Sequence, residues 1–243
     1  MTPPGPEAVF DALEATWPAR AVENCGPFRI RNGDGGGKRV SAATTDSAAL
    51  PDDVDQANRA MQAFRQTPLY MIREGNDALD ALLGTQGYDR LDPTVLYLAP
   101  AENLARTYPI TTIIPAWPPL AMQGEIWAAG GVDANRLRVM ERAADPKVSI
   151  LGRIADTPSA TAFVAAHEGI AMLHALEVRP ANRRQGMGEI LLRAAAQWAL
   201  EQGAQWLALA VTRANRAANA LYAKLGMSPL AGYHYRQAPE VTL

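Results

Sequence analysis

In the C-terminal half of the chain, apolar runs alternate with short polar segments in a regular order. Three runs rich in Val, Ile, Ala and Thr, the last two divided by a turn at Glu168-Gly169, predict a meander of antiparallel strands. Apolar positions every three or four residues then predict two helices, each followed by a strand. The elements are strands at 148–154, 161–166 and 170–178, a helix at 186–202, a strand at 206–212, a helix at 216–225 and a strand at 233–237.

Strands 170–178 and 206–212 are joined by a predicted helix, and a helical crossover makes two strands of one sheet parallel. The C-terminal half is therefore expected to be a mixed α/β fold, with a twisted sheet flanked by helices. Upstream, the pattern predicts helices at 120–129 and 135–143, divided at Gly130-Gly131. The segment 109–119 contains four prolines, so we expect it to be irregular and to separate two domains, 1–108 and 120–243.

The N-terminal half shows a similar order of elements. It predicts helices at 8–15, 54–65 and 77–83 and strands at 28–31, 39–44, 69–72 and 94–98. Several residues recur in the second half at a spacing of 139: Asn76 and Asn215, Leu79 and Ala218, Leu82 and Leu221, Gly87 and Gly226. In both copies an Asn is placed to cap a helix with an apolar face. Leu83 stands where the second copy has Tyr222.

The composition excludes several classes of protein. The 243 residues are 48% hydrophobic and carry 23 Lys and Arg against 25 Asp and Glu, a net charge of −2 that offers no attraction to nucleic acid or an anionic membrane. A single cysteine, Cys25, leaves no internal disulfide and favours a reducing, cytoplasmic location, and the three histidines show no metal-ligand spacing, so we expect no metal. No secretion signal or 18-residue apolar run is evident. Neither a monomer nor a homodimer is excluded.

The segment that follows strand 170–178 predicts an anion site. It reads Arg179-Pro-Ala-Asn-Arg183-Arg184-Gln185-Gly186-Met187-Gly188 and leads from a buried strand into a helix. The first N–H groups of a helix are unpaired and lie at the positive end of its dipole, and glycines let a diphosphate approach them. The spacing Arg-x-x-Gly-x-Gly is not the Gly-x-Gly-x-x-Gly of dinucleotide folds. The run Gly35-Gly36-Gly37-Lys38 lacks the first Gly and the final Ser or Thr of a phosphate loop.

At this point the sequence resembles the GNAT superfamily of acetyl-CoA-dependent N-acetyltransferases. The strand with Arg183-x-x-Gly186-x-Gly188 is one signature, and Asn215-x-x-Ala218-x-x-Leu221-Tyr222-x-x-Leu225-Gly226-Met227 is the second, with Met227 in place of the usual Phe. The resemblance covers about residues 148–237. It implies a GNAT fold in which the parallel strand pair splays apart and acetyl-CoA binds in the opening as co-substrate. The implied binding residues are Leu176, Val178, Arg183, Arg184, Gln185, Gly186, Met187, Gly188, Glu189 and Asn215.

By the same resemblance, Tyr222 is expected to protonate the departing thiolate. Periodicity alone favours a packing aromatic at this position. The sequence does not identify the general base: Glu177 and His174 are both candidates, and a water relay is a third possibility. The two residues are an odd number of positions apart, so in a regular strand their side chains would point to opposite faces of the sheet. A weak base favours an acceptor with a low pKa, such as an α-amine.

We expect a tandem protein with a degenerate N-terminal GNAT-like half, because 1–108 lacks the Arg-x-x-Gly-x-Gly motif. The C-terminal half is expected to transfer acetyl directly to a small-molecule or peptide amine, since Cys25 lies outside it and offers no thiol route. The tail Gly232-Tyr233-His234-Tyr235-Arg236, and Glu125 and Trp127, either border the acceptor or only pack. The alternative function is a non-catalytic acyl-CoA-binding or protein-interaction module.

Overall fold

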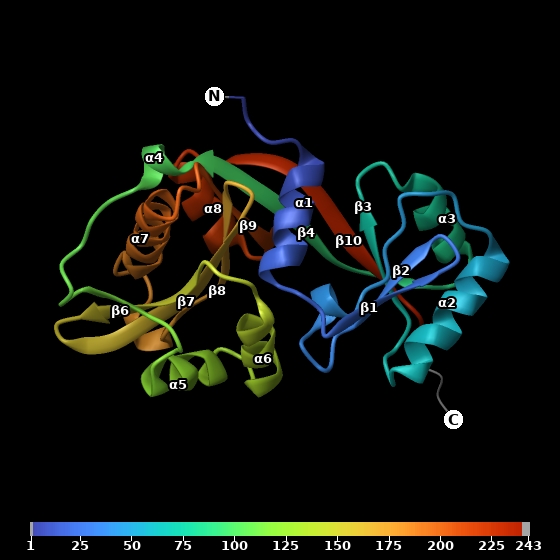
Figure 1. Cartoon of the computed structure of the whole chain (residues 1–243), viewed down its shortest axis with the longest axis horizontal. Helices are drawn as coiled ribbons and strands as arrows, with labels where there is room; N and C mark the ends of the chain where they lie inside the picture. Colours follow the sequence, from blue (N-terminus) through green and yellow to red (C-terminus); the bar gives the residue numbers. More distant parts are fainter. Residues whose placement is uncertain (1, 240–243) are drawn as a thin grey trace.

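A computed structural model describes residues 2–239 of the chain. Eight strands form a single sheet in the order β3-β10-β4-β9-β8-β7-β6-β5, and a separate hairpin pairs β1 with β2 (Figure 1). The strands are β1 Ala21–Cys25, β2 Phe28–Asn32, β3 Leu69–Arg73, β4 Asp89–Pro100, β5 Ile113–Ala116, β6 Lys147–Ile154, β7 Thr157–His167, β8 Ile170–Val178, β9 Trp206–Thr212 and β10 Ser228–Gln237. The helices are α1 Pro6–Thr16, α2 Pro51–Ala63, α3 Asp77–Thr85, α4 Ala101–Leu104, α5 Ala121–Ala129, α6 Ala134–Arg142, α7 Met187–Glu201 and α8 Arg216–Lys224.

The mixed α/β fold and the order of elements in the C-terminal half confirm the predictions. Strands β6, β7 and β8 are antiparallel neighbours, and β8 pairs with β9 in parallel across the crossover helix α7. One face of this part of the sheet packs on α7, whose apolar stripe includes Leu191, Leu192 and Ala195. The other face packs on α1 and α5 (Figure 1).

Two local predictions fail. Residues 39–44 do not form a strand: Lys38–Val40 is a 3₁₀ turn, and beyond it only isolated bridges at Ala43 and Thr44 remain. The glycines before Lys38 explain the error, because positive φ values at Gly35 and Gly37 allow a compact turn where apolar alternation favours a strand. The proline-rich segment 109–119 is not wholly irregular, since Ile113–Ala116 forms β5 at the sheet edge, where proline in a strand is tolerated.

The two halves of the chain meet in the sheet by interleaving their strands. Strand β10 lies between β3 and β4, and β4 in turn lies between β10 and β9, all antiparallel. The long strands β4 and β10 therefore run through the middle of the molecule (Figure 1). Helices α3 and α8 begin and end 139 residues apart, the same spacing as the sequence repeat. Each half thus contributes a β-α-β unit that receives one strand of the other.

The parallel pair is open at one end. Its ladder runs from Ile170–Trp206 to Leu173–Leu209 and stops, so the last residues of both strands do not pair with each other. Ala175, directly beyond, has φ of 47° and produces a bulge: Phe163 opposes His174, and Thr161 opposes Glu177. The two strands therefore splay apart after Leu173, as expected.

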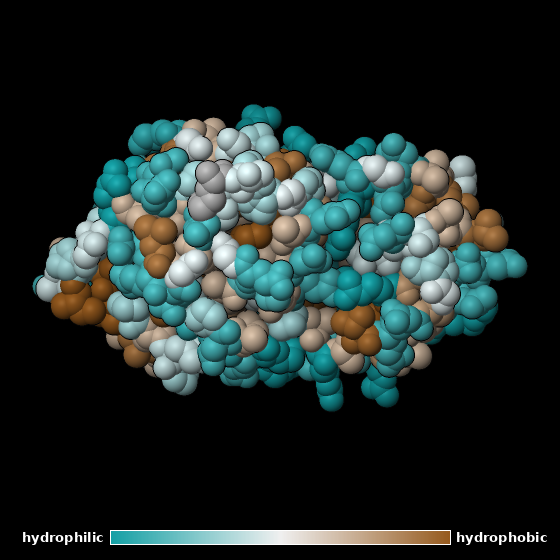
Figure 2. Space-filling view, turned by 45° about the horizontal axis from the view of Figure 1, so that its top comes forward, coloured by the Kyte–Doolittle hydropathy of each residue, from teal (hydrophilic) through white to brown (hydrophobic). Residues whose placement is uncertain are grey.

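The outer surface is mixed in polarity. On the face shown in Figure 2, apolar residues form small groups separated by polar ones. Within the described residues, no helix is long and apolar enough to cross a membrane.

Candidate functional site

The segment between β8 and α7 forms a tight, exposed loop. After the 3₁₀ turn Pro180–Asn182, Arg184 takes φ of 65° and Gly186 takes φ of 83°, after which α7 begins. Glycine adopts the left-handed conformation of Gly186 at little energetic cost, whereas a residue with a Cβ would be strained there. A Cβ at Gly188 would meet only the Leu221 side chain, at 3.4 Å. Gly188 therefore keeps the outer side of the first helical turn open.

This loop presents a row of main-chain donors. Among residues 2–239, no backbone acceptor lies within hydrogen-bond distance of the N–H groups of Gln185 to Glu189, and the first donor used is that of Ile190, which bonds Gly186 O at 3.1 Å. Five consecutive free N–H groups at a helix N-terminus, in an exposed loop with arginines, form a site suited to a diphosphate. The predicted anion site thus has the required geometry.

Arg183 and Glu189 make side-chain contacts that connect the loop and the start of α7 to neighbouring elements. Arg183 bends back to β8, where Nε donates to Val178 O at 3.2 Å and a terminal nitrogen lies 3.3 Å from Glu177. Arg184 is exposed. The Glu189 carboxylate accepts from Arg193 at 3.0 Å and Lys224 at 3.3 Å, and so ties α7 to α8. Met187 is buried and contributes to the core instead of the loop surface.

The open edge of β8 faces the splay. Arg179 N–H donates to Ser159 O on β7, and main-chain groups of a strand alternate in direction, so those of Leu176 and Val178 point toward β9. Strand β9 does not pair with them, because the ladder ends at Leu173. An extended amide-containing ligand can bond there as an added strand does.

Tyr222 and Asn215 lie on α8, on the α7 side of the sheet. The Asn215 side chain accepts from Ala218 N–H at 3.1 Å and caps the helix, as predicted. The same prediction is wrong for Asn76 in the first copy, whose side chain makes no cap and donates to Thr45 O at 2.9 Å. Tyr222 is buried beside Tyr97, with ring centroids 5.7 Å apart. Burial raises the pKa of the Tyr222 hydroxyl to about 12, so the group keeps its proton at neutral pH and can serve as a hydrogen-bond donor.

On the opposite face of the sheet, the splay opens into a cavity of about 460 Å³. Ala175 and His174 line it from β8, and Ala210 and Thr212 line it from β9. The other lining side chains come from five distant segments: Trp17, Lys38 and Arg39, Asp92 and Thr94, Val132 and Arg136, and Tyr233 and Tyr235. This size is typical of small-molecule sites. Tyr233 and Tyr235 therefore border a cavity, one of the two positions considered for the C-terminal aromatic residues.

His174 is fixed in one tautomer. Thr16 Oγ1 donates to Ala12 O at 2.6 Å, so it must accept from His174 Nε2, 2.8 Å away. Nδ1 is then the unprotonated nitrogen, and it accepts from Arg39 at 3.3 Å. Burial, and secondarily the charge of Arg39, hold the pKa of His174 well below its usual range. With its lone pair bonded to a cation, this imidazole is a poor proton acceptor.

Glu177 lies on the same face of the sheet as His174, contrary to the parity expected from the sequence. The extra residue at the Ala175 bulge shifts the alternation by one, so both side chains stand on the face of Thr161 and Phe163. The Glu177 side chain lies against Gly130 at the end of α5, where a Cβ would approach it to 2.4 Å. Burial raises the pKa of Glu177, although Arg183 opposes this.

Glu125 and Trp127, which the sequence placed either beside the acceptor or in packing, differ in their roles. Trp127 is buried and donates from Nε1 to Ala175 O at 2.7 Å, which holds the bulge in place. Glu125 lies on the surface, 3.7 Å from Arg179.

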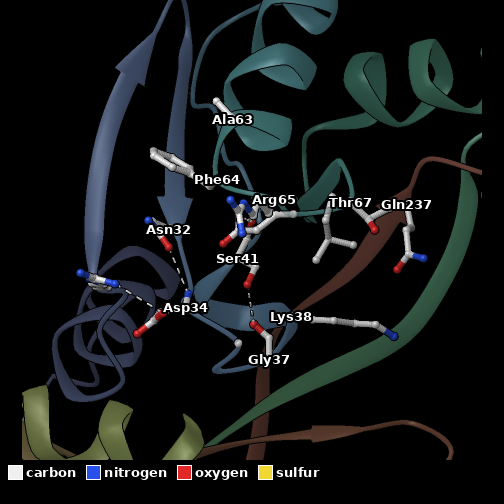
Figure 3. A pocket seen from close by; sticks show the side chains of 14 residues that line it. Asn32, Asp34, Gly37, Lys38, Ser41, Ala63, Phe64, Arg65, Thr67 and Gln237 are labelled. Carbon is white, nitrogen blue, oxygen red and sulfur yellow. Dashed lines mark hydrogen bonds and ion pairs between the residues drawn. The ribbon is translucent and has the colours of Figure 1, made fainter.

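A second cavity of about 590 Å³ adjoins the first, with Gly37 and Lys38 on the border of both (Figure 3). Asn32, Asp34, Ser41 and Arg65 give it polar walls. The glycine run, which lacks the residues of a phosphate loop, thus lies between two cavities.

The sequence analysis missed the residues that the N-terminal half brings to the first cavity. Arg39, Asp92 and Trp17 come from three separate elements, and no local motif marks any of them. Within residues 2–239, no group of three or more His, Cys, Asp or Glu side chains is placed to hold a metal ion.

Comparison with known proteins gives consistent results. Residues 125–227 match the model of the acetyltransferase (GNAT) family. The chain is 26% identical over 235 residues to the uncharacterized N-acetyltransferase YobR of Bacillus subtilis, covering 91% of this chain and 94% of that protein. A GCN5-related N-acetyltransferase structure from Kribbella flavida aligns with a TM-score of 0.72 at 21% identity over 98% of both chains.

A tandem GNAT protein from the clavulanic acid biosynthesis pathway aligns with a TM-score of 0.57 at 12% identity, over 82% of this chain and 76% of that one. The matched segment 125–227 contains the loop, the splayed strands and the α8 helix described above. This segment matches the acetyltransferase (GNAT) family, and the protein is an acyltransferase.

Proposed function

We propose that this protein transfers the acetyl group of acetyl-CoA directly to a primary amine, with an α-amine favoured as acceptor. The observation that carries the proposal is the end of the β8–β9 ladder at Leu173–Leu209. There, the free N–H groups of the α7 terminus lie at one end of the splay and a cavity opens on the opposite face. A donor and an acceptor can thus reach the same opening from opposite sides of the sheet.

In this proposal, Gln185 to Glu189 bind the diphosphate with main-chain N–H groups, and Arg184 adds positive charge. The edge of β8 at Leu176 and Val178 orients the pantetheine arm, and Arg183 must release Val178 O if that oxygen is used. Asn215 positions α8 through its cap. Acetyl-CoA supplies an acyl group activated as a thioester.

Proton transfer needs one acid and one base. Tyr222 is the acid: its hydroxyl donates to the sulfur when the C–S bond breaks. Glu177 is the base we favour, directly or through water, because it lies on the acceptor face and burial raises its pKa toward the useful range. His174 is retained as a positioning residue, since Arg39 occupies its free nitrogen.

The weak base supports an acceptor with a low pKa. At pH 7, roughly 10% of an α-amine with pKa near 8 is neutral, against less than about 0.1% of a lysine with pKa near 10.4. The difference amounts to about 3.5 kcal/mol that a lysine acetyltransferase must supply and an α-amine acetyltransferase need not.

We propose in addition that the N-terminal half, 1–108, is a degenerate GNAT-like copy joined through 109–119 to the catalytic half, 120–243. The α3 and α8 units at a spacing of 139, and the interleaved strands β4 and β10, support this. The first copy lacks a loop like that of residues 183–188 and has Leu83 at the place of Tyr222, so its role is to complete the sheet and the cavity.

The test is release of CoA thiol from acetyl-CoA in the presence of a panel of amino acids, amino-acid amides, polyamines and short peptides. We expect transfer to at least one α-amine and slower transfer to lysine side chains. Tight CoA binding with no release for any amine would instead favour a non-catalytic acyl-CoA-binding module.

A further inference from the structure

The cavity at the splay contains an arginine without an anion. Arg39 enters it from the 3₁₀ turn Lys38–Val40, and one terminal nitrogen bonds His174. Its Nε–H is shielded from solvent and has no acceptor among the described residues. A buried donor without a partner is costly. Arg73, Arg142 and Arg179 also have a buried Nε without a partner among the described residues, so this atom alone does not mark a ligand site.

Other guanidinium groups buried as deeply in this protein have carboxylate partners. Arg31 lies 2.8 Å from Glu14, and Arg236 lies 2.6 Å from Asp80. Within residues 2–239, no carboxylate lies within 4.0 Å of Arg39. The described residues therefore leave the charge of Arg39 uncompensated at the cavity beside the splay.

The balance of charge in the cavity points the same way. Three cations line it, Lys38, Arg39 and Arg136, against one carboxylate, Asp92. Asp92 is already paired with Lys38 at 2.7 Å, and the Arg136 guanidinium bonds Gly131 O. Of these three cations, Arg39 is the one with neither a carboxylate nor a main-chain oxygen as partner in the described part of the chain; His174, Tyr233 and Tyr235 lie beside its guanidinium. A carboxylate in the cavity would supply the missing negative charge, and guanidinium groups bind carboxylates with paired N–H donors.

The position of Arg39 also fixes where the rest of a ligand lies. Its partner His174 directly follows Leu173, the last residue of β8 that pairs with β9. A group held by Arg39 therefore lies beside the start of the splay, on the acceptor face. Tyr233 and Tyr235 border the same cavity, with their hydroxyls beside Arg39.

From these observations we infer that Arg39 binds the carboxylate of the acceptor, so that the substrates of this enzyme are amines that carry a carboxylate, such as free amino acids. The inference rests on the proposed function and narrows it to amines that carry a carboxylate. Because the carboxylate raises the amine pKa above that of a peptide N-terminus, the base must contribute more to deprotonation than the low-pKa argument requires. It makes Arg39, from the N-terminal half, a residue that determines specificity. A free carboxylate near the amine also excludes the N-termini of long peptides and proteins as acceptors.

The test compares matched acceptors that differ only in the carboxylate: glycine with glycinamide, L-phenylalanine with L-phenylalaninamide, and β-alanine with β-alaninamide. A carboxylate raises the pKa of the nearby amine, so the informative quantity is the acid-to-amide ratio of kcat/KM in each variant. Arg39→Gln should lower this ratio by about 10- to 150-fold, chiefly through KM for the acid, as loss of a hydrogen-bonded charge pair implies.

Two further variants keep the test decisive. Arg136→Gln removes a cation from the same cavity whose guanidinium is already bonded, and should change the ratio less than about threefold. Arg39→Lys keeps the positive charge but loses the planar guanidinium and its paired N–H donors, so it should recover only part of the preference for acids over amides. Acetyl-CoA affinity and the thermal unfolding midpoint, measured on every variant, separate a local effect from misfolding.

The outcomes distinguish the two proposals. Acids preferred by the wild type, with the preference lost in Arg39→Gln, support the inference. Transfer to amides but not to acids, or equal ratios in wild type and Arg39→Gln, overturns it and leaves the transferase standing. Absence of transfer to every amine overturns both.

Discussion

His174 should make the stability of this protein depend on pH, because the fold accommodates only its neutral form. Nε2 donates to Thr16 and Nδ1 accepts from Arg39. A second proton would go to Nδ1, where it would face an Arg39 N–H and place two positive charges 3.3 Å apart in a buried site. His174→Gln replaces the imidazole with a group that stays neutral at every pH.

The sign and size of this pH effect on stability follow from the difference between the pKa of His174 in the folded and in the unfolded chain. The pKa of His174 is about 6.5 in the unfolded chain and well below that in the fold, so at pH values between the two the unfolded state binds the extra proton. Stability from this group is complete above pH 6.5 and falls as the pH falls. Each unit of pH costs about 1.4 kcal/mol, so about 1.4 kcal/mol is lost at pH 5.5 relative to pH 8, and roughly twice that at pH 4.5 if His174 is still neutral in the fold.

Urea denaturation at pH 8, 6.5 and 5.5 measures this effect. The free energy of unfolding of the wild type minus that of His174→Gln should fall by about 1.4 kcal/mol between pH 8 and 5.5. His167→Gln, at an exposed histidine, serves as the matched control and should follow the wild type in parallel. A wild-type-minus-variant difference that does not change with pH would refute the buried neutral imidazole and, with it, the Arg39 contact.

Three predictions concern the proposed chemistry. Tyr222→Phe removes the acid and should lower kcat by roughly ten- to ten-thousandfold, with CoA affinity unchanged in a calorimetric titration; an unaltered kcat would assign Tyr222 to packing alone. Glu177→Gln should lower kcat/KM by about 100-fold or more at pH 7. Because the pKa of Glu177 is raised, the acid limb of the wild-type pH profile should lie above the usual range for a glutamate, and it should vanish in the variant. If the variant keeps that limb, another group is the base. Gly188→Val should weaken CoA binding in a folded protein, since its Cβ meets only the Leu221 side chain in the fold, while the smaller Gly188→Ala should weaken it less; equal CoA affinity in all three proteins would contradict the loop assignment.

Features with a local cause were predictable from the sequence. The apolar periodicity of residues 216–224 and the Asn215 cap are local, and the structure has both. The glycines of the loop after β8 correspond to a left-handed residue and an open helical turn. The spacing of 139 between repeats reappears as equal bounds of α3 and α8. These features depend on a few neighbouring residues, and the sequence contains that information.

Features that depend on distant packing were not predictable. Alanine is not a residue that favours positive φ, yet Ala175 adopts it because Trp127 holds its carbonyl, and this bulge reverses the parity expected for Glu177. Strand β10 between β3 and β4 requires both halves to be folded together. Arg39 reaches His174 across 135 positions of sequence, and only the fold brings them into contact.

The central claim is that a thioester donor binds where β8 and β9 separate. A crystal structure with acetyl-CoA tests it most directly. We expect the diphosphate within hydrogen-bond distance of the N–H groups of Gly186 to Glu189, and the pantetheine arm along Leu176 and Val178 with Tyr222 near the sulfur. Coenzyme A bound at another surface, or β8 and β9 paired beyond Leu173–Leu209, would contradict the account.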